Sequence, residues 1–419
     1  MSNMSQGPIL LFDKSFLQSL SVDEAVWLDN FFLNNITPLF FAETLADLEK
    51  EVRAGRTPDQ VVGTLALKTP DMQAYPCAHH TKLIQGALTG YSVPMDARIP
   101  MDSGTVVDLE GKLGMFFPAT QEEEALRRWY RREFLDVERQ IAKIWRRQLC
   151  NPDYEVLYNF FQNWFPIGKP KNLCEAKRLA EAYIDGSPRE ASLRFGMKLF
   201  GIPPASQQQV IGLWEKAGAP AIRDFAPYFH HVYCVDLFYN LAVAADLISR
   251  VRPKGKADNK VDIAYVYYLP FCIVFTSSDR LHERIVPLFL RADQSFVKGR
   301  DLKDGLRKID EYYSAFPEEV RGSGFHKFAG YPPNDSSFLV TQLWDKHLPD
   351  WRKLKDERRE RDPAVDRFLL DEIKRIEKEA VESGDPHREV SLDDIQFAQM
   401  KRTVMRRKGK WERFGPDVK

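Results

Sequence analysis

The stretch Asp262-Ile-Ala-Tyr-Val-Tyr-Tyr-Leu-Pro-Phe-Cys-Ile-Val-Phe-Thr-Ser-Ser-Asp279 decides the fold class of this chain. Its first half predicts a short aromatic helix over 263–269 that Pro270 ends, and the apolar run 271–275 predicts a strand leading to Asp279. Because this strand has no polar alternation, it is expected to be buried on both faces, as parallel strands between two layers of helices are. Ligands of such sheets collect beyond the carboxyl ends of the strands, which is where Asp279 is expected.

A second part of the same sheet edge is predicted near the N-terminus. Pro8-Ile-Leu-Leu-Phe-Asp13 is another apolar run that ends on an aspartate, and Ile36-Thr-Pro-Leu-Phe-Phe-Ala-Glu43 leads into a helix that carries a glutamate. Ser21 and Glu24 have the spacing of a capping box, so a helix is expected between the two runs. Residues 8–50 therefore predict strand, helix, short strand, helix, within an α/β core whose parallel central sheet is flanked by helices.

The composition indicates a globular protein without a strong overall charge. The 419 residues exceed what one hydrophobic core usually organises, and 60 Lys and Arg balance 60 Asp and Glu, so a nucleic-acid partner would need local basic patches. No apolar segment is long enough to cross a bilayer, and no signal peptide is recognisable. The cysteines lack CxxC spacing and favour reduced thiols in a cytoplasmic protein; they are Cys77, Cys150, Cys174, Cys234 and Cys272.

Punctuation by Gly and Pro divides the chain into four predicted ranges. Residues 1–54 and 230–300 form the two parts of the α/β core, and residues 55–229 form a large, mainly helical insertion that includes a long amphipathic helix over 122–148. Residues 301–419 are expected to form a helical C-terminal region that ends in a basic tail.

Four acids carry the predicted chemistry: Asp13, Glu43, Asp262 and Asp279. Carboxylates that converge on one cleft repel one another unless their pKa values rise or a divalent cation binds between them. Oxygen ligands without Cys or His indicate Mg²⁺ or Mn²⁺, and such an ion can activate water and offset charge on a phosphoryl group. The alternative that each acid only caps a helix or a turn stays open.

These residues resemble PIN-domain nucleases of the PIN/FEN type. Leu10-Leu-Phe-Asp13-Lys-Ser15 looks like the opening strand of that family, and Glu43 in Ala-Glu-Thr-Leu-Ala-Asp47 matches its helical glutamate. Asp262-Ile-Ala-Tyr followed by Val274-Phe-Thr-Ser-Ser-Asp279 is similar to its closing helix-strand-Asp unit. The resemblance implies that the four acids are both catalytic residues and metal ligands for Mg²⁺ or Mn²⁺, that RNA is cut in preference to DNA, and that Ser15, Ser277 and Asp47 are supporting polar groups.

The long path between the second and third acids departs from compact members of this family. Asp258 or Asp236 therefore remains an alternative to Asp262 as the third acid. A phosphatase of the haloacid-dehalogenase type also begins with a strand ending on Asp, but it needs a second Asp two residues later, where this chain has Ser15.

The end of the chain is basic and aromatic, a composition suited to a nucleic-acid backbone. The predicted nucleic-acid contacts are Lys401, Arg402, Arg406, Arg407, Lys408, Lys410 and Arg413, and the alternative is an ordinary soluble terminus. The leading hypothesis is thus a metal-dependent ribonuclease. Its rival is a catalytically inactive PIN-like scaffold that binds nucleic acid or a protein, and a protein partner or a second copy of the chain is left open.

Overall fold

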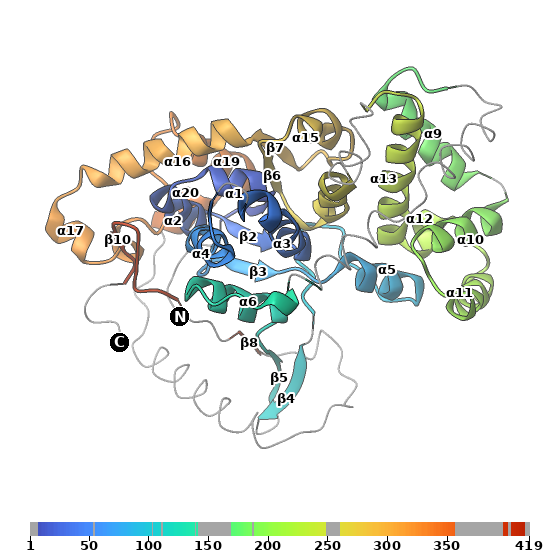
Figure 1. The fold of residues 1–419 in the computed structure, drawn as a ribbon, viewed down its shortest axis with the longest axis horizontal. Coiled ribbons are helices and arrows are strands. Elements are labelled where there is room, and N and C mark those ends of the chain that lie inside the picture. The colour runs from blue at the N-terminus through green and yellow to red at the C-terminus, as the bar shows by residue number, and fades with distance from the viewer. Residues whose placement is uncertain are drawn as a thin grey trace.

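A five-stranded parallel sheet in the order β3-β2-β1-β6-β7 forms the centre of the molecule, with helices on both faces (Figure 1). The computed structural model describes residues 7–52, 55–102, 104–109, 112–138, 140, 169–186, 188–248, 260–356, 397–400 and 404–414. The strands are β1 (Ile9–Phe12), β2 (Leu33–Ile36), β3 (Ala74–Pro76), β6 (Val274–Ser277) and β7 (Ser295–Lys298). The predicted α/β class with a parallel central sheet is confirmed.

The N-terminal part follows the predicted order of strand, helix, strand and helix. Helices α1 (Lys14–Ser19) and α2 (Val22–Phe31) connect β1 to β2, and α3 (Pro38–Val52) and α4 (Pro58–Lys68) connect β2 to β3. The capping box is present at the start of α2: the amide of Glu24 donates to Ser21 Oγ at 3.0 Å, and Glu24 Oε2 accepts from the Ser21 amide at 2.6 Å. Local sequence therefore sets where α2 begins.

Both faces of the sheet are buried, as the continuous apolar runs predict. Leu11 packs in one hydrophobic cluster, whereas its neighbours Leu10 and Phe12 pack in the other. The second cluster also contains Trp27 of α2 and Trp344 of α19 (Leu339–His347), two of the largest fully buried side chains. Alternation along a strand sends successive side chains to opposite faces, so β1 organises both cores.

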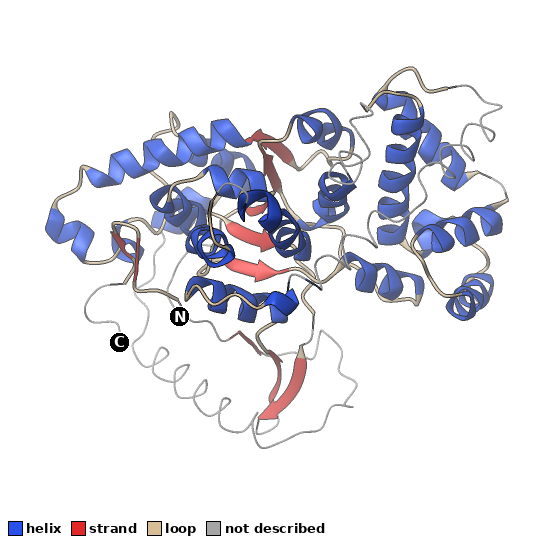
Figure 2. Cartoon of the chain, viewed as in Figure 1, coloured by secondary structure: helices blue, strands red, loops and turns tan. Residues whose placement is uncertain are grey.

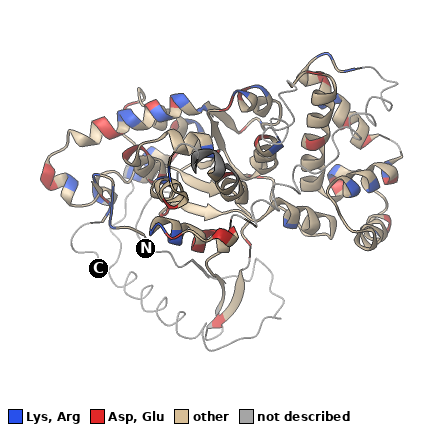
Figure 3. Cartoon of the chain, viewed as in Figure 1, with Lys and Arg blue, Asp and Glu red and all other residues tan. Residues whose placement is uncertain are grey.

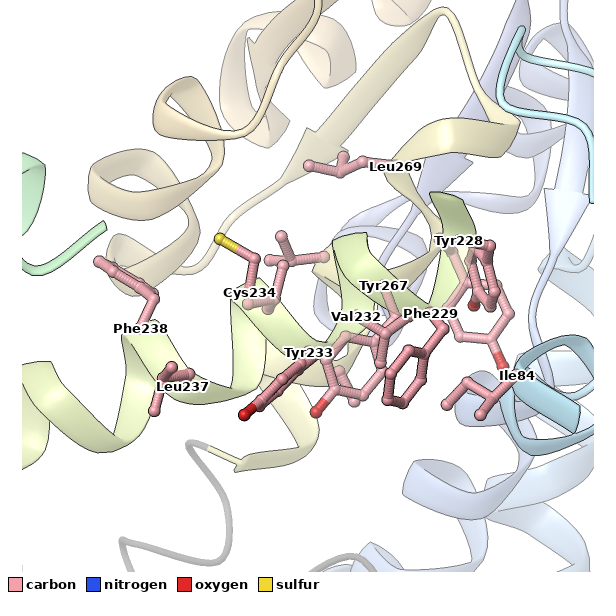
Figure 4. Packing of buried hydrophobic residues seen from close by; sticks show 14 of the residues in the cluster. Ile84, Tyr228, Phe229, Val232, Tyr233, Cys234, Leu237, Phe238, Tyr267 and Leu269 are labelled. Carbon is pink, nitrogen blue, oxygen red and sulfur yellow. The ribbon is translucent and has the colours of Figure 1, made fainter. Parts of the chain in front are cut away.

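A helical region lies beside the sheet (Figure 2). It consists of α5 (His80–Leu88), α9 (Leu173–Asp185), α10 (Arg189–Leu199), α11 (Pro204–Lys216), α12 (Ile222–Phe225) and α13 (Pro227–Ala244). Helix α13 is buried around most of its circumference, which is typical of a helix inside a large core. Figure 4 shows buried side chains of α13, among them Tyr228, Phe229 and Tyr233. The ring centroids of Phe229 and Tyr233 lie 5.7 Å apart, and those of Tyr228 and Phe271 lie 5.2 Å apart. This packing joins the helical region to the segment that leads into β6.

The stretch before β6 forms more helix than predicted. Residues 260–265 are α-helical and continue directly into a 3₁₀ helix, η1 (Val266–Phe271). Pro270 lies inside η1, so the prediction that Pro270 ends the helix is wrong. A proline in the last turn is tolerated here because the tight 3₁₀ turn ends one residue later, at Phe271.

Two predicted boundaries need correction. The sheet extends beyond residue 54, because its edge strand β3 lies within the range predicted as insertion. The helix predicted over 122–148 ends at Tyr130 as α6 (Gln121–Tyr130), where Arg131 is the C-cap and Arg132 adopts a φ of 61°. Residues 141–148 of that prediction lie outside the described residues.

The remaining elements are the helices of the C-terminal half and two smaller sheets. The helices are α15 (Arg280–Ile285), η2 (Val286–Leu288), α16 (Gly299–Ser314), α17 (Glu318–Gly322), α18 (Phe325–Phe328) and α20 (Trp351–Asp356). Strands β4 (Thr105–Leu109), β5 (Lys112–Phe117) and β8 (Phe397–Met400) form a second sheet, and β9 (Arg407–Lys408) pairs with β10 (Trp411–Glu412). Charges of both signs are interspersed over the helices (Figure 3). Of the described helices, none has the length and apolar character required to cross a bilayer.

Candidate functional site

Adjacent central strands bring Asp13 and Ser277 together. Strand β1 pairs in parallel with β6, with Phe12 opposite Thr276, so the residues that follow lie side by side. Ser277 Oγ donates to Asp13 Oδ2 at 2.6 Å, and Asp13 Oδ1 accepts from the Phe16 amide at 2.8 Å as the N-cap of α1. The first acid is thus both a helix cap and part of the sheet edge.

Asp279 reaches the same edge two residues after Ser277. Its amide donates to Ser277 Oγ at 2.9 Å, and its carboxylate caps α15 by accepting from the Leu281 amide at 2.5 Å. Ser15 Oγ also donates to Asp13 Oδ2, at 2.8 Å. The two serines that were predicted as supporting groups therefore both bind Asp13.

Glu43 enters the site from α3 and is held by two side chains. The hydroxyl of Tyr265 donates to Glu43 Oε2 at 2.9 Å, and Lys14 Nζ lies 3.7 Å from Glu43 Oε1. Lys14 is buried next to the first acid, and its ion pair with Glu43 offsets part of the negative charge. Lys14 follows Asp13 in the sequence but pairs with the second acid.

Asp262 lies in the helical residues 260–265, and its pKa depends on the charges of the other three acids. Burial is the largest cause that raises the pKa of Asp262; the charge of His282 opposes it, the charges of Glu43, Asp279 and Asp13 add to it, and the net pKa is about 8. Such coupling requires the carboxylates to be near one another. The structure therefore brings the four predicted acids to one electrostatic site at the carboxyl edge of the sheet.

His282 is fully buried beneath this site and was not predicted. Its Nδ1 lies 2.7 Å from Ser277 Oγ and 3.6 Å from Asp13 Oδ2, and its Nε2 lies 2.7 Å from the carbonyl oxygen of Asp262. Because the carbonyl only accepts, Nε2 carries a proton. Because Ser277 gives its single proton to an ionised Asp13, Nδ1 must donate to Ser277 as well.

The hydrogen-bond pattern thus describes an imidazolium paired with a carboxylate. Burial would lower the pKa of His282, but its close approach to the Asp13 carboxylate and the charge of Asp262 raise it to about 9. Burial would likewise raise the pKa of Asp13, but the nearby His282 and the hydrogen bonds from Ser277 and the Phe16 amide lower it. His282 lies one helical turn after Asp279, and this spacing is the only sequence signal that could have identified it.

Asp236 and Asp258 were the alternatives to Asp262 as the third acid. Asp236 of α13 is buried in an ion pair with Lys260, and its Oδ1 accepts from the Tyr267 hydroxyl at 2.6 Å. Asp236 thus ties the helical region to the helix that carries Asp262, and its carboxylate is engaged there by Lys260 and Tyr267. Asp258 and the side chain of Asp47 lie outside the described residues.

The donor set of the site fits a hard cation in chemistry, since the four acids supply only oxygen. In the part of the chain that the structure describes, no three acidic, His or Cys side chains are arranged to hold a metal ion. The hydrogen bonds to Asp13 and Asp279 and the ion pair of Glu43 account for this arrangement. Metal binding would require these carboxylates to rotate away from their present partners.

Two residues of the basic tail, Lys408 and Arg413, are buried in the protein core. Arg413 is fully buried and lies 2.7 Å from Asp29 Oδ2 and 2.6 Å from Asp71 Oδ1, and Lys408 Nζ donates to the Thr69 carbonyl at 2.7 Å. Lys408 and Arg413 therefore cannot contact a nucleic acid, and that prediction is wrong for both.

The remaining tail residues differ in environment. Lys410 Nζ lies 2.5 Å from Asp310 Oδ2, whereas Arg406 and Arg407 are exposed. Lys401 and Arg402 lie outside the described residues. The buried pairs arise because β9 and β10 dock on α2, a long-range contact that local charge does not reveal.

Comparisons with protein-family models, with curated proteins and with solved structures found no match to this chain.

Proposed function

We propose that this protein is a nuclease that hydrolyses phosphodiester bonds with Mg²⁺ or Mn²⁺, with RNA as the preferred substrate over DNA. The observation that carries the proposal is the convergence of Asp13, Glu43, Asp262 and Asp279, which come from four separate segments, at the carboxyl edge of a parallel sheet. If each acid served only as a helix cap, there would be no reason for all four to lie near one another and to raise the pKa of Asp262.

The four acids would hold the cation, which supplies a more acidic bound water and offsets charge on the phosphoryl group. The protein's own groups fix the ligands. Ser15 and Ser277 hold Asp13, Tyr265 holds Glu43, and His282 bridges Asp13 to the backbone of Asp262. Such partners of metal ligands restrict rotation and keep the carboxylates ionised.

The rival function is a PIN-like scaffold that binds nucleic acid or a protein without cutting. One observation favours it: Lys14 forms an ion pair with Glu43, so a cation of the protein already neutralises one of the acids. A cut substrate in the presence of metal would decide against the scaffold.

The deciding experiment is a cleavage assay on single-stranded and duplex RNA and DNA oligonucleotides, with Mg²⁺, Mn²⁺, Ca²⁺ or chelator. We expect Mn²⁺- or Mg²⁺-dependent cleavage of single-stranded RNA that Asp13→Asn and Asp279→Asn abolish. Asparagine is also a good N-cap, so both variants keep α1 and α15. Asp304→Asn, at an exposed acid of α16, is the matched control and should cut normally. Unchanged cleavage by Asp13→Asn and Asp279→Asn would remove these acids from the mechanism.

A further inference from the structure

Two lysines from different helices meet at the end of α1. Lys68, the last residue of α4, donates to the carbonyl of Gln18 at 2.7 Å, and Lys303 of α16 donates to the carbonyl of Ser19. Helix α1 lies between α16 and α4 (Figure 1). Because the two carbonyls belong to consecutive residues, the two ammonium groups are held close together.

Carboxylates offset this concentration of positive charge only in part. Among the described residues, neither Lys68 nor Lys303 has an acidic side chain at ion-pair distance. Burial lowers the pKa of Lys68, and the charges of Lys303 and Arg56 lower it further. The carboxylate of Glu24, which caps α2, acts in the opposite direction and offsets part of this charge. Like charges held together are unfavourable unless an anion binds between them.

The side chains that α1 exposes between these lysines and the acids are polar and uncharged. Ser15, Gln18 and Ser19 of α1 are exposed, and Ser15 Oγ binds Asp13 at the other end of the same helix. Hydroxyl and amide side chains with lysines are the groups that contact phosphates and sugars in nucleic-acid complexes. An apolar protein partner would find no hydrophobic anchor on this face.

The distance along α1 suits a nucleic-acid strand. The six residues of α1, at a rise of about 1.5 Å each, separate the acids from the lysines by about 9 Å. Nucleotides of a stacked strand follow one another every ~3.4 Å, so the lysines would meet phosphates about two to three nucleotides from a bond at the acids.

We define the α1 surface as Lys68, Lys303 and the exposed side chains of α1, which are Ser15, Gln18 and Ser19. We propose that this surface binds the phosphate backbone of a nucleic-acid strand next to the four acids. This inference rests on the proposed function, since it assumes that the strand passes the acids. It places nucleic-acid binding on the surface of the α/β part of the protein and not on the basic tail.

The test uses the full-length chain and a fluorescein-labelled single-stranded RNA of about 20 nucleotides, with chelator present. Fluorescence anisotropy at several salt concentrations gives the slope of log K against log salt. The double variant Lys68→Gln/Lys303→Gln keeps side-chain donors for the two carbonyls but removes both charges. We expect its slope to shrink by about 1.4, or about 0.7 per lost phosphate contact.

Three controls make the result specific. Arg307→Gln/Lys308→Gln removes two exposed charges of the same helix α16 and should leave the slope unchanged. Lys68→Arg/Lys303→Arg keeps the charges and should bind normally, which separates loss of charge from misfolding. A poly-glutamate competitor should displace RNA only weakly, since it lacks the spacing of a phosphate backbone.

Three results would refute the proposed role of the α1 surface. The first is an unchanged slope in Lys68→Gln/Lys303→Gln, and the second is an equal decrease of the slope in this variant and in Arg307→Gln/Lys308→Gln. The third is binding of poly-glutamate in preference to RNA. The nuclease proposal is read out separately by cleavage with Mn²⁺. Cleavage with an unchanged slope refutes only the α1 surface. A reduced slope without cleavage by the wild type keeps this surface and refutes the nuclease.

Discussion

Replacing Asp262 by asparagine should make the metal-free protein more stable. Burial and three neighbouring acids raise the pKa of this carboxyl from 3.8 to about 8, so the folded protein holds a proton that the unfolded chain releases at neutral pH. Asparagine has a similar shape and no charge to desolvate. The substitution thus removes the unfavourable interaction and keeps the packing.

The magnitude follows from the pKa difference. At about 1.4 kcal/mol per pH unit, the interval from 3.8 to pH 7 sets an upper bound of about 4 kcal/mol. Asp262 keeps some contact with solvent, which weakens the effect, so we expect a gain of about 1–2 kcal/mol in the free energy of unfolding at pH 7.

The sign also predicts a pH dependence. For a carboxyl with a raised pKa in the folded state, the contribution to stability is most favourable below pH 4 and is lost as pH rises from about 4 to about 8. The unfolding free energy of the wild type minus that of Asp262→Asn should therefore become more negative over this interval and level off above pH 8. Urea denaturation at pH 5, 7 and 8.5, with chelator, measures this difference.

Adding Mn²⁺ should reverse the order of stability. Metal ligands must be ionised, so Mn²⁺ should bind the wild type more tightly as pH approaches 8 and stabilise it by about 2.7 kcal/mol at 100 times its Kd. Asp262→Asn should gain much less. The exposed control Asp304→Asn should stay within about 0.5 kcal/mol of wild type throughout. A loss of stability in Asp262→Asn without metal, or a pH profile parallel to that of wild type, would refute the reasoning.

Two further predictions concern buried charges. Arg413→Met should lower the free energy of unfolding by about 3–5 kcal/mol in urea denaturation, because it leaves Asp29 buried without its closest cation; the exposed Arg407→Met is the control, and an equal effect of both would contradict the role of the buried pair. His282→Gln should reduce kcat for Mn²⁺-dependent RNA cleavage by about 10–100-fold with little change in KM, because Asp13 loses its buried partner; a change in KM alone would show that His282 acts on substrate binding.

Local sequence was sufficient for the elements of the core. The apolar runs that became β1 and β6 are buried on both faces, and the capping box at Ser21 sets the start of α2. These features depend on neighbouring residues and on burial, and both can be predicted from the hydrophobic periodicity and the composition of each segment. The helix predicted beyond Tyr130 and the strand missed at Ala74–Pro76 show the limit, because tertiary packing selected between alternatives that local propensity leaves close in energy.

The sequence by itself determined which acids end the two central strands. An Asp that directly follows a buried apolar run lies at the carboxyl edge of a parallel sheet, whatever the order of the strands. Only the tertiary structure decided what surrounds these acids. Lys14 pairs with Glu43, His282 lies beneath Asp13, and the tail residue Arg413 is buried against Asp29. Each of these pairs joins segments that are distant in sequence or on separate elements. Their charges are compatible with solvent or with many partners until packing excludes water, and burial then makes a paired charge far more stable than a lone one.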